Sequence, residues 1–180
     1  MKNIPVILLA SARKDSDTKK FIEKVFSNTE YKVIDLLDFT VLPYDYSHQY
    51  SEKDEFFKII EELMQHETIV FATPVYWYSM SGLMKTFFDR LTDLVTIKKT
   101  SGRDLKDKST FLVAVGTDKE LPVGFDKPFE LTSWYLHMIY LGHIYYSTEH
   151  QLPVQMMEFI IELFIQKVKD NSDRSSNSGS

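Results

Sequence analysis

Residues 67–93 read ETIVFATPVYWYSMSGLMKTFFDRLTD and decide the fold. The stretch opens with the apolar run IVFA, which predicts a short strand buried on both faces of a sheet. We expect this strand to end at Thr73-Pro74, because proline has no amide to donate to a neighbouring strand. A helix is expected from Gly82 with Ser81 as its cap, since apolar residues then recur at three- and four-residue spacings. A buried strand, a loop and a helix in this order form half of a βαβ unit.

The rest of the chain repeats this alternation of strands and helices. Further strands are predicted at residues 4–10, 31–37, 109–115 and 143–148, and further helices at residues 19–26, 51–64, 129–141 and 154–168. Ser51 is the expected N-cap of the second helix, and residues 96–108 are expected to form a charged connection. This alternation predicts an α/β protein whose parallel sheet is covered by helices on both faces.

Polar loops follow the first, third and fourth predicted strands. Their sequences are SARKDSDT at residues 11–18, TPVYWYSMSG at residues 73–82 and GTDKELPVG at residues 116–124. In the strand order 2-1-3-4-5 these strands are neighbours, and the first and third flank the point where the order reverses. Because ligands of open α/β sheets bind at the carboxyl ends of the strands, one ligand could touch all three loops.

Composition limits the possible functions. The length of 180 residues suits one domain, and a net charge of −5 without a dense Lys/Arg cluster argues against a nucleic-acid partner. The absence of cysteine excludes disulfides, thiolate nucleophiles and cysteine-bound iron–sulfur clusters. Any redox function therefore needs a bound cofactor. The histidines have no metal-site spacing, so no metal is expected, and paired carboxylates and a GxSxG elbow are missing.

The ends of the chain carry two further expectations. The first apolar run is too short for a signal peptide or a membrane span, which predicts a cytoplasmic protein without a membrane partner. Residues 169–180, KDNSDRSSNSGS, are too polar to be buried and are expected to be a disordered tail. The folded domain is therefore predicted to span residues 1–168.

The first loop has the groups that bind a phosphate monoester. Ser11, Ser16 and Thr18 offer hydroxyls, Arg13 offers a forked cation, and a helix begins near Thr18. Neither GxxxxGK[ST] nor GxGxxG occurs, so a nucleoside triphosphate or a dinucleotide is not indicated. The alternative is that Asp17 or Ser16 only caps the helix while Arg13 is solvated. The carboxylates of this loop would repel a phosphate unless they point away.

The other two loops suit a flat aromatic ligand. The candidate contacts are Pro74, Val75, Tyr76, Trp77, Tyr78 and Ser79 in the second loop, and Gly116 and Thr117 in the third. Consecutive rings in a loop cannot all enter the core, so some are expected to be exposed or to cover a ligand. A hydrophobic lid or a dimer contact is the alternative for the second loop, and an ordinary turn is the alternative for the third. The aromatic residues Trp134, Tyr135, Met138 and Tyr140 are expected to be mostly core, with the remainder a dimer surface or substrate wall.

Together the three loops resemble those of the flavodoxin-like NAD(P)H-dependent FMN reductases and quinone reductases. The first loop is similar to that family's Ser-x-Arg followed by Ser and Thr, and the third, like the family's, contains glycine. The family's Pro-x-Tyr, then Gly, Lys and Asp, is matched by Pro74, Tyr76, Gly82, Lys85 and Asp89. The resemblance covers roughly residues 4–168.

The resemblance implies a flavodoxin-like three-layer sandwich with a five-stranded parallel sheet and non-covalently bound FMN. The FMN phosphate would lie on Ser11, Arg13, Ser16, Asp17 and Thr18, and the isoalloxazine ring against residues 74–79 and the loop of Gly116 and Thr117. NAD(P)H would then reduce a quinone, a flavin or a nitro- or azo-aromatic acceptor, with no catalytic side chain required and with a homodimer as the expected assembly. A flavodoxin-type electron carrier and a cofactor-free domain acting through protein contacts are the alternatives.

Overall fold

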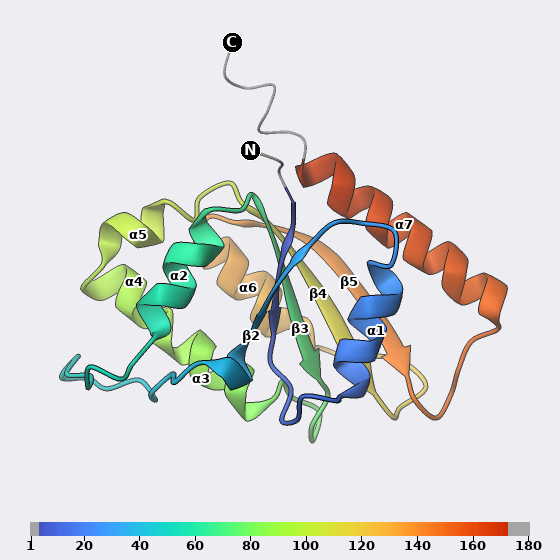
Figure 1. The fold of residues 1–180 in the computed structure, drawn as a ribbon, viewed down its shortest axis with the longest axis horizontal. Helices are drawn as coiled ribbons and strands as arrows, with labels where there is room; N and C mark the ends of the chain where they lie inside the picture. The colour runs from blue at the N-terminus through green and yellow to red at the C-terminus, as the bar shows by residue number, and fades with distance from the viewer. Residues whose placement is uncertain (1–3, 173–180) are drawn as a thin grey trace, which may run out of the picture.

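The computed structural model describes residues 4–172 as a five-stranded sheet of order β2-β1-β3-β4-β5. The strands are β1 (Val6–Leu9), β2 (Lys32–Asp35), β3 (Thr68–Pro74), β4 (Ser109–Gly116) and β5 (Ile139–Ser147). Every neighbouring pair is parallel. The helices lie on both sides of this sheet (Figure 1), so the predicted fold class and strand order are confirmed.

The helices complete a three-layer arrangement. They are α1 (Asp17–Val25), the 3-10 helix η1 (Leu36–Asp38), α2 (Phe56–Met64), α3 (Gly82–Arg90), α4 (Thr92–Thr96), α5 (Lys99–Arg103), α6 (Lys127–Tyr135) and α7 (Val154–Ser172). Alternate residues of each strand point to opposite faces of the sheet, which gives the protein two cores. Leu8 belongs to the core under α2, α3 and α6, whereas Ile7 belongs to the core under α1 and α7.

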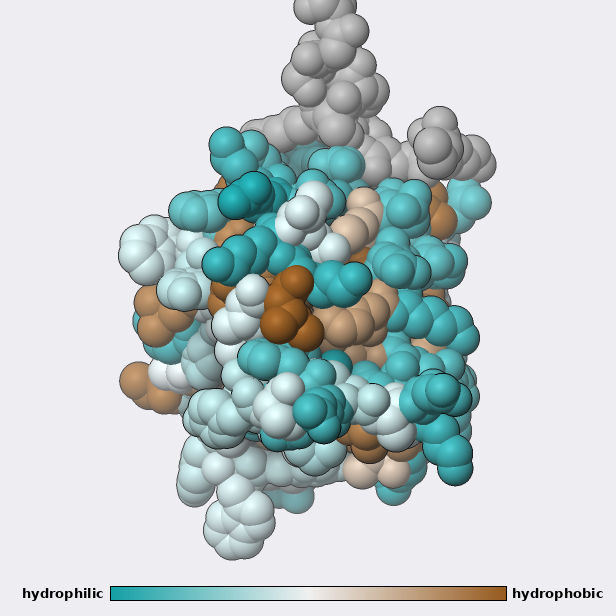
Figure 2. Space-filling view, turned by 90° about the vertical axis from the view of Figure 1, so that its left-hand side faces the viewer, coloured by the Kyte–Doolittle hydropathy of each residue, from teal (hydrophilic) through white to brown (hydrophobic). Residues whose placement is uncertain are grey.

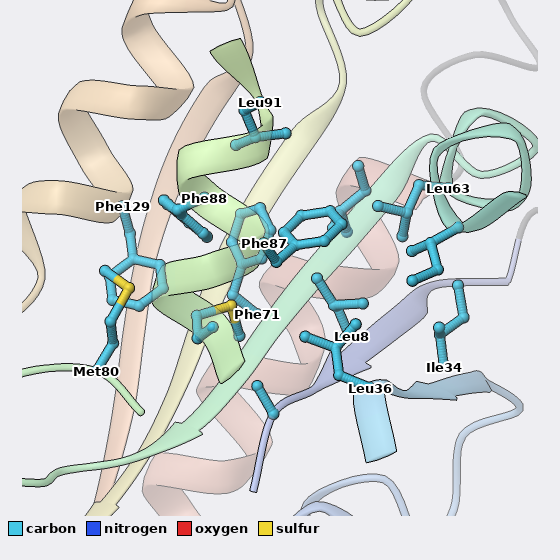
Figure 3. Close-up of a cluster of buried hydrophobic side chains, with 14 of the residues drawn as sticks. Leu8, Ile34, Leu36, Leu63, Phe71, Met80, Phe87, Phe88, Leu91 and Phe129 are labelled. Atoms are coloured by element: carbon cyan, nitrogen blue, oxygen red, sulfur yellow. The ribbon is translucent and has the colours of Figure 1, made fainter. Parts of the chain in front are cut away.

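The larger core is built around aromatic rings (Figure 3). Phe71 of β3 lies edge-on to Phe88 of α3 at 5.2 Å between ring centroids, and Phe88 lies edge-on to Phe129 of α6 at 5.1 Å. Such edge-to-face pairs add to the free energy gained by burying the rings. β3 and β4 are buried along their whole length, which explains why their sequences are continuous apolar runs.

The expected cap of α2 is wrong. The helix begins at Phe56 rather than at Ser51, and its N-cap Glu55 makes no side-chain capping bond. Residues 40–55 instead form a loop with closely spaced ends, because the amide of Glu55 donates to the carbonyl oxygen of Thr40 at 2.8 Å. The carboxylate of Asp54, which the expected capping box needed, binds Arg90.

Three other boundaries differ from the predictions. Residues 96–108 are not a plain connection, because they include α5. The helix predicted at 129–141 ends at Tyr135, and β5 starts at Ile139. The prediction joined the two elements because the apolar residues of the helix and of the strand after it follow one another without a break in the sequence. α7 continues to Ser172, whose buried hydroxyl donates to the hydroxyl of Thr68 at 3.0 Å, so the expected tail starts too early. Residues 173–180 of that tail lie outside the described residues.

The aromatic patch expected to be mostly core is divided. Met138 is buried, but Trp134 and Tyr135 are exposed at the end of α6. Tyr140 lies in β5 rather than in a helix, because the chain turns at His137 with a φ of 58°. No helix within residues 4–172 has the length and apolarity needed to cross a membrane.

Arg90 of α3 is fully buried and holds the loop of residues 40–55 against the helices. Its guanidinium donates to Asp93 at 2.8 Å, to Asp54 at 3.0 Å and to the carbonyl oxygen of Leu42 at 3.0 Å. The same group stacks on the ring of Tyr50 with its carbon 3.5 Å from the centroid. A single cation therefore neutralises two buried carboxylates and joins three segments of the chain.

Replacing Arg90 by Met should lower the free energy of unfolding by about 3–5 kcal/mol, because Asp54 and Asp93 would remain buried without their counter-ion. Lys85→Met on the same helix is the matched control. Lys85 forms an exposed pair with Asp89, and its loss should cost less than about 1 kcal/mol. Urea denaturation followed by far-ultraviolet circular dichroism measures both values, and equal costs would contradict the role assigned to Arg90.

Candidate functional site

A cavity of about 430 Å³ lies at the carboxyl edge of the sheet, where the loops after β1, β3 and β4 meet. Figure 1 shows these three loops side by side at the lower edge of the molecule. The cavity is lined by the predicted residues Ser11, Arg13, Ser16, Asp17, Thr18, Pro74, Val75, Tyr76, Gly116 and Thr117, and also by Ala12, Val115 and Thr148. Residues of all three loops therefore line one cavity.

The first wall of the cavity is the start of α1. Ser16 is the N-cap, and its hydroxyl oxygen accepts a hydrogen bond from the amide of Lys19 at 3.2 Å. Ser11, Ser16 and Thr18 are almost completely buried. Within residues 4–172 the hydroxyls of Ser11 and Thr18 make no hydrogen bond to protein, so both are available to a ligand. A helix N-terminus with free hydroxyls favours an anion.

The charged groups of this loop are paired with one another. The guanidinium of Arg13 lies 3.1 Å from the carboxylate of Asp17, and both side chains line the cavity. The carboxylate of Asp15 is largely exposed and lies 3.1 Å from Lys20. Asp15 thus does not line the cavity, whereas Asp17 does, with Arg13 compensating its charge.

Lys14 closes the loop against the end of β2. Its ammonium group lies 2.6 Å from Asp38 and 2.9 Å from Asp35. Hydrogen bonds with Asp38 and Asp35 raise the pKa of Lys14 above its ordinary value, so the amine stays charged. Lys14 is therefore engaged with β2, which leaves Arg13 as the cation of this loop that lines the cavity.

Ser81 joins the first and second loops. Its hydroxyl donates to the carbonyl oxygen of Ala10 at 2.7 Å and accepts from the amide of Met84 at 3.2 Å, so it caps α3 as predicted. Its amide donates to the hydroxyl of Thr73 at 3.0 Å. The capping role is visible in the sequence, but the bond to Ala10, far away along the chain, is not.

The aromatic loop between β3 and α3 is a tight hairpin. Tyr76 and Ser79 exchange two backbone hydrogen bonds of 2.9 and 3.0 Å, and Trp77 and Tyr78 form the turn with φ values of 49° and 61°. Positive φ at both central residues defines a type I′ turn. Tyr76 lines the cavity, but Trp77, Tyr78 and Ser79 do not, so the structure does not bring these three predicted residues into the cavity wall.

Gly116 ends β4 where there is no room for a side chain. A Cβ atom there would lie 2.8 Å from the hydroxyl of Tyr145 and 3.1 Å from the Cβ of Val75. The Tyr145 hydroxyl donates to the carbonyl oxygen of Asp118 at 2.8 Å, and burial, with a smaller contribution from the Asp118 charge, raises the pKa of Tyr145. Tyr145 therefore stays protonated and keeps the third loop in place.

Thr148 is the cavity residue that a reading of the loops one by one misses. It follows β5, and its amide donates to the carbonyl oxygen of Gly116 at 2.8 Å. Because β5 neighbours β4, the residue after β5 lies at the same edge as Gly116. The strand order 2-1-3-4-5 already places β5 beside β4, so Thr148 could have been predicted from it. Ala12 and Val115, which were also not predicted, lie next in the chain to predicted cavity residues.

A larger hollow, of about 540 Å³, lies elsewhere between α4, α5 and α6. Its walls include Leu94, Arg103 and Trp134, and it shares no residue with the cavity at the strand ends. No group of three His, Cys, Asp or Glu side chains suited to a metal ion occurs in the part of the chain that the structure describes.

Known proteins resemble this chain in sequence and in fold. The model of the NADPH-dependent FMN reductase family matches residues 5–152. The chain is 32% identical over 98 residues to a putative NAD(P)H-dependent FMN-containing oxidoreductase, YwqN, of Bacillus subtilis. That match covers 51% of this chain and 53% of YwqN, so the chain spans about half the length of this relative.

Solved structures share the fold. An NADPH-quinone reductase from P. pentosaceus superimposes with a TM-score of 0.66 at 17% identity, covering 92% of this chain and 97% of the other. General stress protein 14 of Treponema denticola, solved in complex with FMN, gives a TM-score of 0.61 at 18% identity, covering 95% and 98%.

Gly116→Ala should destabilise the protein by about 1–3 kcal/mol, because the added methyl group overlaps Tyr145 and Val75. Tyr145→Phe removes the closest atom, so the cost of Gly116→Ala should be smaller in that background. Gly82→Ala, where no atom lies within 4 Å of the new Cβ, is the control and should cost nothing. Thermal unfolding of the four variants gives the comparison, and additive effects at positions 116 and 145 would contradict the close approach.

Proposed function

The chain belongs to the NADPH-dependent FMN reductase family, and we propose that it is an FMN-dependent oxidoreductase that transfers electrons from NAD(P)H to a small aromatic acceptor. The observation that carries this proposal is the single cavity in which an anion-binding loop, an aromatic loop and a glycine loop meet. A phosphorylated flat molecule needs these three features together. The curated relative whose name includes FMN adds support.

The residues present fit FMN. The free hydroxyls of Ser11 and Thr18, the N-terminus of α1 and the cation of Arg13 would hold the phosphate. Val75, Tyr76 and Gly116 line the cavity and would contact a flat ring beside the strand ends. Asp17 would have to share Arg13 with the phosphate.

Bound FMN would supply the reversible two-electron chemistry that no side chain of this chain offers. In the overall reaction NAD(P)H gives two electrons and one proton, solvent gives a second proton, and a quinone becomes a hydroquinone. The protein's part is to bind, orient and shield the reactants, so we propose no catalytic side chain. Quinones, nitro- and azo-aromatics and free flavin are the acceptor classes that fit this chemistry, and a cytoplasmic location is proposed with it.

One observation favours a competing function. Arg13 already has Asp17 as its partner, which is the arrangement expected of a domain that works without a cofactor. The visible spectrum of the purified protein separates the two, since only the oxidoreductase should show the absorption bands of a flavin. Oxidation of NADPH with menadione then separates an enzyme from an electron carrier, which should turn over negligibly without a partner reductase.

Arg13→Ala should weaken FMN binding roughly ten- to hundredfold, because a charge-assisted hydrogen bond to the phosphate is lost. Fluorescence titration of the apoprotein with FMN measures the dissociation constant.

Two variants in the same loop and helix serve as controls. Lys20→Ala removes a cation that pairs with Asp15 outside the cavity, and it should change FMN affinity less than about threefold. Asp17→Asn releases Arg13 and should strengthen binding. Equal losses in Arg13→Ala and Lys20→Ala would mean that only net charge matters, and the proposed phosphate site would be wrong.

We also propose that the protein is a homodimer formed through α6. Leu131, Trp134 and Tyr135 are 59%, 75% and 63% exposed and lie at three- and four-residue spacing on one face of this helix. The hollow between α4, α5 and α6 borders the same face of α6. A two-fold axis would therefore place these three side chains of each copy against the hollow of the other. The side of the molecule that carries α2, α4 and α5, on the left in Figure 1 and facing the viewer in Figure 2, is largely hydrophilic with scattered hydrophobic side chains.

Leu131→Ser combined with Tyr135→Ser should convert this dimer into a monomer, as measured by size-exclusion chromatography with light scattering. The matched control is Phe159→Ser combined with Leu163→Ser on α7, which also removes exposed apolar side chains but borders only a small hollow of about 160 Å³. A monomeric wild type, or dissociation by the α7 changes alone, would contradict the proposed interface.

A further inference from the structure

The loop after β4 is bound to the end of β5 through its backbone carbonyl groups. The carbonyl oxygen of Gly116 accepts a hydrogen bond from the amide of Thr148 at 2.8 Å and a longer one from the hydroxyl of Thr148 at 3.3 Å. The carbonyl oxygen of the next residue, Thr117, accepts from the hydroxyl of Ser147 at 3.1 Å. Ser147 is buried, and its hydroxyl oxygen accepts in turn from the amide of His150 at 2.9 Å. Two successive peptide groups of the loop are thus fixed by the end of β5.

Tyr145 fixes a third peptide group of this loop. Its hydroxyl donates to the carbonyl oxygen of Asp118 at 2.8 Å, and burial, with a smaller contribution from the Asp118 charge, raises the pKa of Tyr145. The hydroxyl therefore keeps the proton that it donates. Ser147 lies two residues further along the strand, so both side chains project from the same face of β5. One face of one strand thus holds the carbonyl side of the loop.

This attachment determines where the amides of the loop point. A peptide group is planar and almost always trans, so its N–H bond points away from its C=O bond. The three carbonyl groups are bonded toward β5, and the amides of the same peptide groups, which belong to Thr117, Asp118 and Lys119, therefore point away from β5. β3 lies on that other side of β4, and the loop after β3 lines the same cavity as Thr117.

These amides are available to a ligand. Within residues 4–172 the amides of Thr117, Asp118 and Lys119 make no hydrogen bond to protein. A row of backbone donors in a fixed loop suits oxygen and nitrogen acceptors on the edge of a flat ring. Such donors stabilise an acceptor more strongly when it carries negative charge.

We propose that the end of β5 raises the reduction potential of the bound flavin. Tyr145, Ser147 and Thr148 are the positioning residues, and the amides that they orient donate to the acceptor edge of the ring. This inference rests on the proposed function. A hydride from NAD(P)H brings two electrons and one proton, so the reduced ring carries one negative charge more than the oxidised ring until a second proton arrives from solvent. Fixed donors at that edge therefore stabilise the reduced form more than the oxidised form.

The decisive variants are Ser147→Ala and Tyr145→Phe, each of which removes one hydroxyl donor. Neither side chain lines the cavity, so each acts on a ligand only through the loop. The midpoint potential of bound FMN, measured against a dye of known potential, should fall by about 30 mV in each variant, which corresponds to about a tenfold change for two electrons. Titration of the apoprotein with oxidised FMN should show a loss of affinity of less than about threefold, because the oxidised ring carries less charge.

Two further variants of the same strand serve as controls. Tyr146→Phe makes the same chemical change as Tyr145→Phe one residue further on, but its ring lies on the opposite face of β5 and stacks on Phe21. It should leave the potential unchanged. Ser147→Thr keeps the hydroxyl and should retain the wild-type potential. Tyr145→Phe keeps its ring, so it carries the test if Ser147→Ala does not fold.

The outcomes separate this inference from the proposed function. A wild-type protein that binds no FMN overturns both. An unchanged potential in Ser147→Ala and Tyr145→Phe overturns the inference alone, and so does an equal shift in Tyr146→Phe. Equal losses of affinity for oxidised and reduced FMN would show that these hydrogen bonds only keep the loop folded. That result also overturns the inference and leaves the proposed function standing.

Discussion

The arrangement of the site depends on two hydrogen bonds made by the backbone of Ala10. Its amide donates to the carbonyl oxygen of Ala72 in β3 at 2.9 Å, and its carbonyl oxygen accepts from the hydroxyl of Ser81 at 2.7 Å. Beyond Ala10 the chain leaves β1 into the loop of residues 11–18, while Ser81 caps α3. Two loops separated by about sixty residues are thereby kept in register at one edge of the sheet.

The buried ion pairs of Arg90 lie away from that edge. Arg90, Asp54 and Asp93 form a buried cluster that fastens a long loop to α3 and α4. At the cavity, by contrast, the hydroxyls of Ser11 and Thr18 have no hydrogen-bond partner within residues 4–172, and the hairpin tip is strained. Groups that are to bind a ligand must be left unsatisfied in its absence, so the stability has to come from elsewhere in the fold.

The two charged side chains that line the cavity, one cationic and one anionic, compensate each other. Arg13 is the cation that faces the cavity, and Asp17 lies against it. Lys14 and Lys20 are drawn to carboxylates outside the cavity. A phosphate entering the site would find one cation and the positive end of a helix, which suits a monoester better than a triphosphate.

The sequence alone determined the fold class and the places of the polar loops, whereas the strand order was an expectation that the structure confirms. Buried parallel strands are continuous apolar runs, and polar loops after the first, third and fourth strands must meet at one edge when those strands are neighbours. These are consequences of local pattern and topology. They needed no knowledge of individual contacts, and the predictions at Ser11, Thr18, Pro74 and Gly116 followed from them.

Tertiary structure alone decided the rest. Ser51 did not cap α2, because Asp54 of the expected capping box binds Arg90, which is distant in the sequence. Trp77 and Tyr78 left the cavity wall, because two hydrogen bonds between Tyr76 and Ser79 turned the aromatic loop into a two-residue hairpin. In both cases the sequence offered a plausible local partner, and a contact that depends on how the chain folds in three dimensions replaced it.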